Sequence, residues 1–556
     1  MAEEQTAGDE DSRRSAVPWL LAVILVLALI PRLQRLGTIS FWFDEAYSVK
    51  MVSFGLAEIL ERASRDIHPP LYYWLLRVWA GGFGDSPVAL RLMSVLFGVL
   101  TVLGVFLFVR EAECGLRPTI SRPSPFGAGV ALFAAALLAL SPLHIAWSLQ
   151  ARMYTLGTAL AAFSGWFLLR ALRRESAQVA DWAGYVVLAV ALAYTHVFGL
   201  FTIAAQAVFA IGVGIYRASS IQSRVRWNTL GAVLVAFFVV EVCWLPWLDT
   251  FLEQKQRVLR GYWIPPFRWE QVLETAYQFF AVTEHGPPPS RELKWIATGF
   301  CFALTAALLL LGRPGHRLMA LGFGLPVASA MILSHFVQPL FITRYFLFAH
   351  LSLLCMFAVV VGLVPTRPAR TCAIGTVLSL ASILCLSQME HREEQARLPG
   401  LAAAMRYVDA VREPGKPLLT GNPMLHLAVL SHIADRDGVR LVGSSQQFPH
   451  FQGTPVVRDD EYLPITQLSA VRANSIWIVE GINWNGGTWT VEMPEPWVST
   501  QEARFPEVYG HDCEIVVRRY ERRDSLSRLM KERENRHRGV QLPAAAAIPS
   551  SQDAWR

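Results

Sequence analysis

The sequence predicts a polytopic α-helical membrane protein with a small α/β domain towards its C-terminal end. Of its 556 residues, 53% are hydrophobic and only 17% are charged, whereas ordinary soluble domains carry about 25% charged residues. The hydrophobic residues also gather into blocks almost free of charge, such as Trp19–Ile30, Ala89–Val109 and Leu340–Val364. These blocks approach the ~20 residues that a helix needs to cross a bilayer. Composition and clustering together exclude an ordinary soluble enzyme.

The positions of the basic residues predict the number and orientation of the spans. Arginines crowd alternate short connections, and such loops stay on the cytoplasmic side of a membrane. The residues concerned are Arg110, Arg117 and Arg122; Arg170, Arg173 and Arg174; Arg217, Arg224 and Arg226; Arg313 and Arg317; and Arg367 and Arg370. Working outward from them predicts eleven spans, at 17–31, 87–109, 126–141, 150–169, 183–197, 199–216, 229–248, 295–312, 318–336, 345–364 and 371–387. The net charge of +6 is thereby explained by membrane orientation, and no nucleic-acid partner is expected.

An odd number of spans places the two ends of the chain on opposite sides of the plasma (inner) membrane. The N-terminal tail, with Arg13 and Arg14, is expected in the cytoplasm, and everything after about 388 is expected outside it. The first apolar block is expected to remain as a span. The sequence that leaves it, Pro31-Arg-Leu-Gln-Arg35, lacks the small residues of a cleavage site.

The chain is expected to divide into four parts that differ in residue composition and pattern. Both long outer loops are dense in Trp, Tyr and Phe, which mark the membrane–water interface. Beyond residue 400, short helical and strand-like runs alternate, which favours an α/β domain. These runs are Leu401–Val411, Pro417–Thr420, Met424–Ile433, Ser475–Val479 and Cys513–Val517. The last segment has too few apolar residues to order itself. The parts are a cytoplasmic tail at 1–16, a transmembrane domain at 17–387 with outer loops 32–86 and 249–294, an extracytoplasmic α/β domain at 388–523 and a disordered tail at 524–556.

Two adjacent carboxylates stand shortly after the first predicted span. Asp44 and Glu45 lie among Phe, Trp and Tyr residues, and acids at a membrane surface are costly to place among apolar rings. A partly desolvated carboxylate can act as a general base for an attacking hydroxyl, while its neighbour orients it or binds a metal. The alternative is that both are solvated loop acids or stabilise the N-terminus of the helix that follows.

Other polar residues fall at the outer ends of predicted helices, and two interpretations stay open for each. His68 precedes a Pro-Pro pair that starts a helix cleanly, so it can bind phosphate or cap that helix. Arg344 can hold a lipid-linked phosphate bidentately, or simply extend to the headgroups. Glu241 lies well inside an apolar span and either lines a cavity or pairs with a neighbour. The rest of the outer cluster comprises Arg152, Tyr154, His196 and Tyr345.

Taken in order, these motifs resemble those of the GT-C glycosyltransferases. The similarity is to the branch of bacterial relatives of protein O-mannosyltransferases and of the lipid A aminoarabinose transferase, often described as RgtABCD-like, and it covers roughly the first 365 residues. The motifs are Asp44-Glu45, His68-Pro-Pro-Leu-Tyr-Tyr-Trp74, Arg91-Leu-Met-Ser94, Ala151-Arg-Met-Tyr154, Tyr194-Thr-His196 and Arg344-Tyr345.

The resemblance implies a membrane glycosyltransferase of the cell envelope that uses a polyprenyl-phosphate sugar. It implies transfer of a hexose or pentose to an acceptor hydroxyl on the extracytoplasmic face, with inversion. Asp44 is then the candidate base, supported by Glu45. The residues implied in donor binding are His68, Arg152, Tyr154, His196, Arg344 and Tyr345. The acceptor is a protein, a glycan or a lipid.

One departure from the resemblance concerns metal use. Many relatives carry an acid where this chain has Gln150, so no cofactor is assigned and a divalent metal stays open. Asp66 or Glu241 could substitute as a ligand.

Two functions of other classes stay open beside the enzyme. A transporter or lipid flippase would place charges and helix breaks near the bilayer midplane, whereas this chain concentrates acids, His and Arg at one face. A non-catalytic assembly subunit would leave binding to the C-terminal domain, and the intact Asp44-Glu45 pair argues against it.

Overall fold

The computed structural model describes residues 2–116, 125–173, 178–219, 226–281, 289–484, 486–510 and 512–524. The chain divides into two compact units, which are considered separately. The membrane unit comprises Met1–Pro399 together with Pro449–Val457, and the C-terminal unit comprises Gly400–Phe448 and the chain from Arg458 onward. The predicted cytoplasmic residues Arg117, Arg122, Arg174 and Arg224 lie outside the described residues, as does the predicted tail beyond Asp524.

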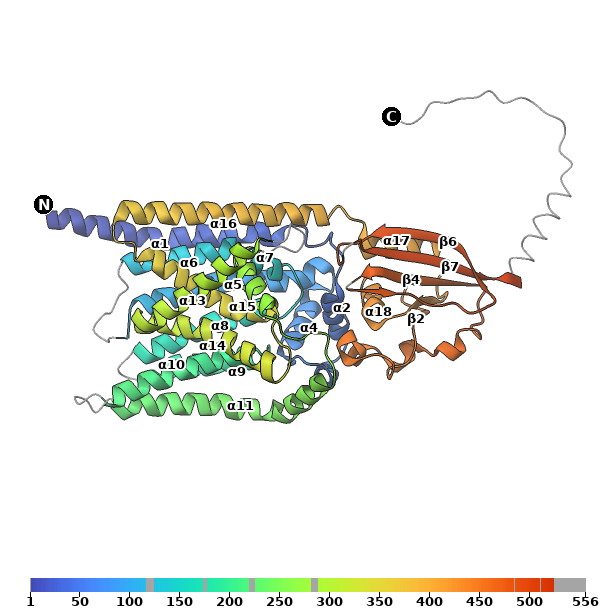
Figure 1. The fold of residues 1–556 in the computed structure, drawn as a ribbon, viewed down its shortest axis with the longest axis horizontal. Coiled ribbons are helices and arrows are strands. Elements are labelled where there is room, and N and C mark those ends of the chain that lie inside the picture. Colours follow the sequence, from blue (N-terminus) through green and yellow to red (C-terminus); the bar gives the residue numbers. More distant parts are fainter. Residues whose placement is uncertain are drawn as a thin grey trace, which may run out of the picture. The chain divides into compact units, whose positions relative to one another are not determined.

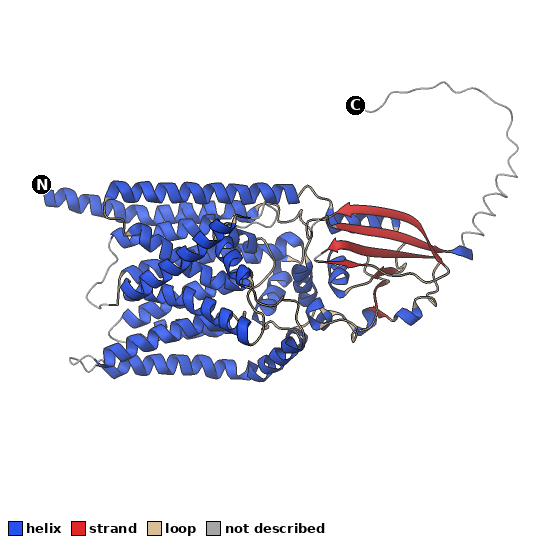
Figure 2. Ribbon diagram, viewed as in Figure 1, coloured by secondary structure: helices blue, strands red, loops and turns tan. Residues whose placement is uncertain are grey.

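Apolar helices account for each of the eleven predicted spans. Nine helices within the described ranges are long and apolar enough to cross a membrane, a bent pair adds a tenth, and α9 (Val179–Ala193) is a shorter apolar helix. The nine are α1 (Ala2–Leu33), α5 (Pro87–Glu113), α8 (Tyr154–Arg173), α10 (Gly199–Ser219), α11 (Arg226–Arg260), α13 (Arg291–Leu311), α14 (Pro314–Phe336), η1–α15 (Thr343–Phe346 and Leu347–Gly362) and α16 (Arg367–Gln395). Figures 1 and 2 show them as a bundle. The prediction of a polytopic helical membrane protein with a C-terminal α/β domain is confirmed.

Several helices extend past the predicted apolar spans as polar turns. The first helix begins at Ala2, inside the predicted tail, and α16 continues to Gln395. The largest extension is in α11, which runs to Arg260 rather than ending near 248. A hydropathy pattern marks only the apolar part of a helix that lies in the bilayer. The backbone hydrogen bonds of the helix can continue beyond it into polar turns, whose side chains are solvated or paired.

The bent pair is one span broken at a proline. Helices α6 (Pro125–Leu140) and α7 (Pro142–Ser148) meet at 60°, because Pro142 lacks the N–H that a continuous helix would use. The buried guanidinium of Arg32 donates to the freed carbonyls of Ala139 at 2.8 Å and Leu138 at 3.1 Å. No water is present in a bilayer core to satisfy such carbonyls, so Arg32 stabilises the break.

Short helices form at the end of the bundle where α1 ends. The predicted outer loop 32–86 folds as α2 (Phe43–Val52), α3 (Leu56–Arg65) and α4 (Leu71–Phe83), and α12 (Trp269–Gln278) belongs to the second outer loop. The basic ends of the helices gather elsewhere, around the C-terminal end of α5. There Arg173 pairs with Glu111 at 2.5 Å and Arg313 approaches Glu113 at 3.6 Å.

The C-terminal unit is a mixed sheet in the strand order β3-β2-β1-β4-β7-β6, with β5 paired to β4. Strands β1 to β4 pair in parallel, and β7 pairs antiparallel with both β4 and β6. The elements are α17 (Gly400–Val411), β1 (Leu418–Thr420), α18 (Pro423–His432), β2 (Val439–Val442), β3 (Tyr462–Leu463), β4 (Ser475–Trp484), β5 (Gly487–Trp489), β6 (Trp497–Pro506) and β7 (Glu514–Arg522). The hydrophobic core of this unit includes Leu419 on β1 and Ile476 and Ile478 on β4. The strand β6 has no apolar run in the sequence because most of its side chains are exposed.

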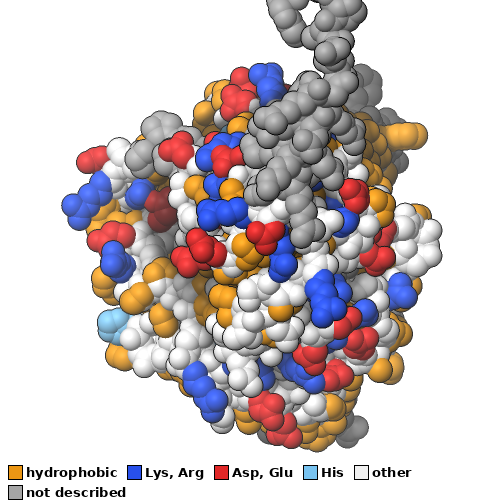
Figure 3. All heavy atoms as spheres, turned by 90° about the vertical axis from the view of Figure 1, so that its right-hand side faces the viewer, with side chains coloured by type: hydrophobic (Ala, Val, Ile, Leu, Met, Phe, Trp, Pro, Cys, Tyr) orange, Lys and Arg blue, Asp and Glu red, His pale blue; other side chains and the backbone are white. Residues whose placement is uncertain are grey.

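Charges of both signs alternate on the C-terminal unit. Arg504 pairs with Glu514 at 2.8 Å and Arg518 pairs with Glu502 at 2.8 Å across β6 and β7. The face drawn in Figure 3 shows Lys and Arg beside Asp and Glu.

Candidate active site

The carboxylate of Asp44 lies between two arginines that come from distant parts of the membrane unit. Its Oδ2 atom is 4.0 Å from Nε of Arg152 and 4.0 Å from Nη1 of Arg344. The Asp44 side chain is 16% exposed and that of Arg152 only 3%. The acid and Arg344, at 16% and 17% exposure, are thus partly accessible, whereas Arg152 is enclosed.

The start of α2 places Asp44. The helix begins after Trp42, which offers no side-chain cap, and Asp44 and Glu45 fall in its first turn, where negative charge is favoured by the helix dipole. The Ser48 hydroxyl donates to the backbone carbonyl of Asp44 at 3.2 Å, and Arg152 donates to the same carbonyl at 3.1 Å. These bonds fix the backbone of Asp44 and leave its carboxylate for other partners.

Glu45 points into the protein instead. Its carboxylate receives two bonds from Arg91, at 2.7 and 2.6 Å, and a third from the backbone N–H of Ala151 at 2.8 Å. Arg91 also donates to the carbonyls of Leu36, Ile39 and Ser40. Both side chains are 1% exposed. Glu45 therefore joins α2, α5 and the loop before α8. These bonds fix the backbone beside Asp44 and beside Arg152.

Arg152 is tied to the same set of short helices. Besides the Asp44 carbonyl, its Nη1 donates to the Ser48 hydroxyl at 3.4 Å and to the Tyr73 hydroxyl at 3.3 Å. Burial lowers the pKa of Arg152, but Tyr73, Asp44 and other neighbouring groups outweigh it, so its pKa lies well above the usual value. Arg152 is a permanent positive charge at the site.

Arg344 is held by aromatic rings. Its guanidinium carbon lies 4.9 Å from the ring centroid of Trp263, 5.7 Å from that of Trp42 and 5.8 Å from that of Tyr345. The preceding Thr343 lines a cavity of about 550 Å³ whose wall also contains Lys294 and Phe341. Ring stacking suits the planar guanidinium and leaves its N–H groups free to bind oxygen atoms.

His196 is the centre of an imidazole and aromatic cluster. Its ring lies 5.4 to 5.7 Å from the rings of Tyr345, His68 and Tyr154. Its Nδ1 atom accepts the backbone N–H of Phe198 at 3.1 Å, which leaves the proton of the neutral ring on Nε2. Burial, aided by His68, Arg152 and Arg344, holds the pKa of His196 well below its ordinary value.

Buried donors without hydrogen-bond partners occur on the two arginines beside Asp44 and on the nearby His196. They are Nε of Arg152, Nε of Arg344 and Nε2 of His196, none of which has a hydrogen-bond partner among the residues that the structure describes. Buried polar groups in native proteins are nearly always hydrogen-bonded. Two of these donors flank the Asp44 carboxylate and the third belongs to the His196 cluster, so the three are candidate contacts for an oxygen-rich ligand.

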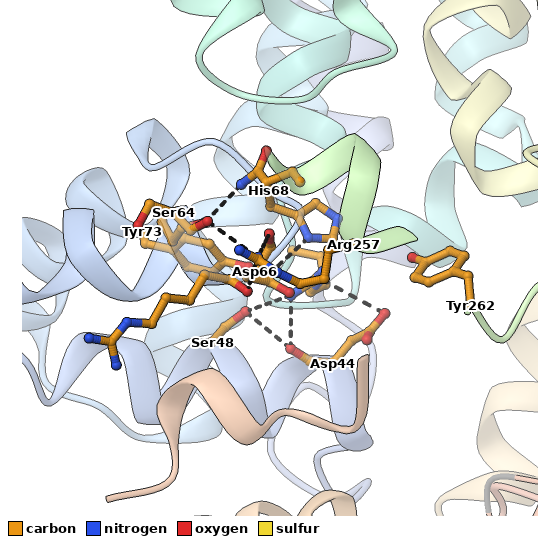
Figure 4. A network of polar contacts seen from close by, with 12 residues as sticks. Asp44, Ser48, Ser64, Asp66, His68, Tyr73, Arg257 and Tyr262 are labelled. Carbon is orange, nitrogen blue, oxygen red and sulfur yellow. Dashed lines mark hydrogen bonds and ion pairs between the residues drawn. The ribbon is translucent and has the colours of Figure 1, made fainter. Parts of the chain in front are cut away.

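A polar pair formed by Asp66 and His68 lies close to Asp44. Asp66 and His68, both buried, face one another with 3.2 Å between Oδ2 and Nδ1. Figure 4 shows them grouped with Asp44, Ser48 and Tyr73, with Arg257 alongside and Tyr262 opposite. The two motifs separated in the sequence thus form one continuous polar network.

A segment from the C-terminal region also belongs to this end of the membrane unit. Within Pro449–Val457, the ring of His450 stacks on Tyr262 at 6.1 Å, and the carbonyl of Pro455 accepts a bond from Arg62 at 2.8 Å. The Tyr262 hydroxyl lies 3.4 Å from that of Tyr345. Nothing in the sequence pattern of this segment distinguished it from the rest of the C-terminal domain.

The structure brings together the residues suggested for donor binding, which are His68, Arg152, Tyr154, His196, Arg344 and Tyr345. It does not bring Glu241 to them, because that side chain is exposed on α11. It also separates the two predicted catalytic acids, since Glu45 is committed to Arg91. Sequence reasoning missed Arg257 and the structural role of Arg91; an arginine near the start of an apolar span was the available signal for the latter.

The side chains present do not fit a divalent metal site. Among the described residues there is no group of three or more His, Cys, Asp or Glu side chains placed to hold a metal ion, whereas a divalent cation takes several oxygen or nitrogen ligands. At Asp44 the neighbouring charges are guanidinium groups, which would repel a cation. Gln150 offers only an amide oxygen, which is buried and has no hydrogen-bond partner among the described residues.

Fold and site together define a polytopic membrane protein with an acid and two arginines at one end of its helix bundle. Comparison with known proteins refines this class. Residues 67–244 match the model of the family described as dolichyl-phosphate-mannose-protein mannosyltransferase. A search of curated proteins gives no match.

Two solved structures share the fold along most of the chain. The apo structure of ArnT from Cupriavidus metallidurans is similar with a TM-score of 0.55 and 15% identity, covering 91% of this chain and 98% of that one. The structure of the same protein bound to undecaprenyl phosphate is similar with a TM-score of 0.52 and 14% identity, with the same coverage of both chains. The predicted likeness is confirmed for the fold, which these structures share, and the mannosyltransferase family model matches within the part of the chain that carries the predicted motifs.

Proposed function

We propose that this protein is a membrane glycosyltransferase that moves a sugar from a polyprenyl-phosphate donor to an acceptor hydroxyl. The observation that carries the proposal is the pair of guanidinium groups on Arg152 and Arg344 beside the carboxylate of Asp44, whose buried Nε atoms, like Nε2 of the nearby His196, have no hydrogen-bond partner among the described residues. A phosphate supplies oxygen atoms for such donors, and planar guanidinium groups match it bidentately. The mannosyltransferase family match and the undecaprenyl phosphate bound by the similar ArnT structure support the same donor class.

The mechanism follows from which bond breaks. The bond between the anomeric carbon and the phosphate oxygen breaks, and a bond from the acceptor oxygen to that carbon forms. The leaving group is a phosphate, which departs as an anion without needing a proton. Arg152 and Arg344 would stabilise that developing charge.

Asp44 is the proposed general base. Its carboxylate is partly exposed, and the described residues approach it with no side-chain contact closer than the two at 4.0 Å, so it can accept the proton of the acceptor hydroxyl as the new bond forms. One displacement on the face opposite the phosphate inverts the anomeric carbon. Glu45 supports this arrangement by fixing the backbone around Asp44, not by touching the reactants.

The extracytoplasmic face is the proposed location of the site. The basic helix ends gather around the C-terminal end of α5, where Arg173 and Arg313 lie near Glu111 and Glu113, and positive residues favour the cytoplasmic side. Asp44 follows the opposite end of α1. The C-terminal unit would then also be extracytoplasmic, and the acceptor would be a protein, glycan or lipid of the cell envelope.

A donor panel tests the proposal. Purified full-length protein would be incubated with labelled hexose and pentose polyprenyl phosphates, with water or envelope acceptors present, and the anomeric configuration of the product determined. Release or transfer of label with inverted configuration is expected for at least one donor. No turnover with any donor that a working relative accepts would contradict the proposal and favour transport or an inactive homologue.

A further inference from the structure

We propose that His450 is a specificity-determining residue, which binds a hydroxyl group of a substrate sugar through its Nε2 atom. The residue belongs to Pro449–Val457, the segment that joins the membrane unit from the C-terminal region of the chain. The inference rests on the proposed function and deepens it. The proposed mechanism gives partners to the phosphate and to the attacking hydroxyl, but none to the other hydroxyls of the sugars.

The segment that carries His450 is anchored beside the candidate active site. It contains two short 3₁₀ helices, η2 (His450–Gln452) and η3 (Thr454–Val456). Helix η3 packs against α3 and against α2, the helix that carries Asp44. Arg62 of α3 donates to the carbonyl of Pro455 at 2.8 Å. These contacts fix where the segment presents His450.

The ring of His450 is held by aromatic neighbours. It lies 6.1 Å from the ring of Tyr262, with 14° between the two planes, and 5.7 Å from the ring of Phe451. The Tyr262 hydroxyl in turn lies 3.4 Å from that of Tyr345. Figure 4 shows Tyr262 opposite the group of side chains that contains Asp44. Two tyrosines therefore connect His450 to the candidate active site.

The Nε2 atom of His450 lacks a protein partner. It is buried and has no hydrogen bond to any residue that the structure describes, although buried polar groups in native proteins are nearly always hydrogen-bonded. The side chain as a whole is only half-buried, so a modest rotation of the ring can bring Nε2 to a ligand. A polar group of a substrate would supply the missing partner.

The charge state of the ring favours a neutral polar ligand. Burial lowers the pKa of His450, and the opposing effects of Asp66 and Arg257 leave that pKa below its ordinary value, so the ring is uncharged at neutral pH. A neutral imidazole has one N–H donor and one acceptor nitrogen, and a hydroxyl group can pair with either. An anion such as phosphate would use only the donor, and Arg152 and Arg344 already offer it charged donors.

Two substrates can supply this hydroxyl. In the proposed reaction Asp44 takes the proton of the attacking hydroxyl and the arginines face the phosphate oxygens. The remaining hydroxyls of the donor sugar, and those of a glycan acceptor, are left for other contacts. His450 recognises the same chemistry in both, which is a carbohydrate hydroxyl. A neutral hydrogen bond of this kind changes affinity by about 3- to 10-fold, enough to favour one sugar over another that lacks the hydroxyl.

The test compares the full-length wild type with two variants of His450. His450→Phe keeps a ring to stack on Tyr262 but removes both nitrogens, whereas His450→Gln keeps a polar group within reach of the Nε2 position. The control is His335→Phe, which makes the same change at an exposed histidine of α14. Tryptophan fluorescence would follow binding of three probes: a polyprenyl phosphate without sugar, hexose and pentose polyprenyl phosphates, and mono- and disaccharides added to the phosphate-bound protein.

The expected loss is confined to probes that carry a sugar. Relative to the control, His450→Phe should bind the sugar-free lipid equally well and should lose about 3- to 10-fold in affinity for the sugar-bearing lipid or for the added saccharide. His450→Gln should recover part of that loss. A loss with the lipid assigns the hydroxyl to the donor, and a loss with the saccharide assigns it to the acceptor.

Analogues that each lack one hydroxyl make the test specific to the contact. Removal of the recognised hydroxyl should weaken binding to the wild type by the same factor and should leave binding to His450→Phe unchanged, because the two partners of one hydrogen bond are not additive.

The outcomes separate this inference from the proposed function. Undiminished affinity of His450→Phe for both kinds of sugar probe, an equal loss with the sugar-free lipid, or the same response of variant and wild type to every missing hydroxyl would overturn the role of His450. The expected binding pattern without transfer from any donor would leave that role standing and contradict the proposed function. If His450→Phe does not fold, His450→Ala takes its place in the same comparison.

Discussion

Oδ2 of Asp44 and Nη1 of Arg344 lie 4.0 Å apart, although the two residues belong to the first and last parts of the membrane unit. Arg344 is stacked among aromatic rings rather than extended towards lipid headgroups. A guanidinium placed in this way beside an acid can receive the phosphate of a donor while the acid receives a proton. In the proposed function this relationship links donor binding to proton transfer, and it leads to the first prediction.

Replacing Arg344 by Ala is expected to weaken binding of a polyprenyl phosphate by about 10- to 100-fold, since a charge-assisted bidentate contact is lost. Arg344→Lys should recover only part of this affinity, because an ammonium keeps the charge but not the planar fork. Tryptophan fluorescence titration would measure both. The control is Arg77→Ala, which removes an exposed arginine of α4. Equal affinity of Arg344→Ala and the control would refute the phosphate role.

Glu45 and Asp44 are adjacent in sequence, but substitution of Glu45 is expected to lower the stability of the fold much more than substitution of Asp44. Glu45→Gln leaves Arg91 buried without its counter-charge, and removal of one partner of a buried ion pair costs about 3–5 kcal/mol. Asp44→Asn removes a partly exposed carboxylate and should change stability by less than about 1 kcal/mol. Unfolding midpoints of the purified variants would show the difference.

A double-mutant cycle sharpens that comparison. Glu45→Leu with Arg91→Met should be less destabilising than either single change, because no charge is left unpaired. A double variant as unstable as the sum of the two singles would show that Glu45 and Arg91 do not act as a pair.

The state of His196 predicts a loss of stability in mild acid. Its pKa is held well below the ordinary value in the folded protein, whereas the unfolded chain has a histidine pKa of about 6.5. Below about pH 6.5 the unfolded state therefore binds the proton first, and stability falls with pH until the folded pKa is reached. His196→Asn should show a smaller drop in melting temperature between pH ~7.5 and ~5.5 than the wild type. An equal drop in both proteins would mean that His196 is not buried in its neutral form.

Chelation is expected to leave transfer unchanged. The described residues around Asp44 offer guanidinium charge rather than a set of metal ligands. Activity measured in excess chelator, with and without added Mg²⁺ or Mn²⁺, would check this. Loss of activity that either metal restores would show that a cation assists the phosphate despite the two arginines.

The sequence was sufficient to predict the spans because hydropathy and loop charge report directly on the bilayer. Apolar helices lie at each of the eleven predicted positions, and the alternating runs after residue 400 form the sheet of the C-terminal unit. The break at Pro142 and the folding of the first outer loop into α2, α3 and α4 depend on tertiary partners such as Arg32, which hydropathy does not record.

The sequence could predict which residues gather at one end of the bundle, but it could not predict which of them contact one another. Sequence order indicated that Asp44, Arg152 and Arg344 face the same side, whereas the distances between them depend on how the helices pack. Nothing local revealed that Glu45 turns away to Arg91 or that Asp66 turns to His68. Side-chain direction in a short loop is set by long-range contacts, so adjacent acids can have different partners.

The most direct measurement is transfer of labelled sugar by Asp44→Asn beside Asp85→Asn, which makes the same change at an exposed acid of the first outer loop. With a donor that the wild type uses, Asp44→Asn should reduce kcat by roughly 10²–10⁴-fold, the usual contribution of a general base, while its melting temperature and phosphate-lipid affinity remain close to those of Asp85→Asn. Turnover by Asp44→Asn equal to that of the control would contradict the account, because no base would then be needed at Asp44.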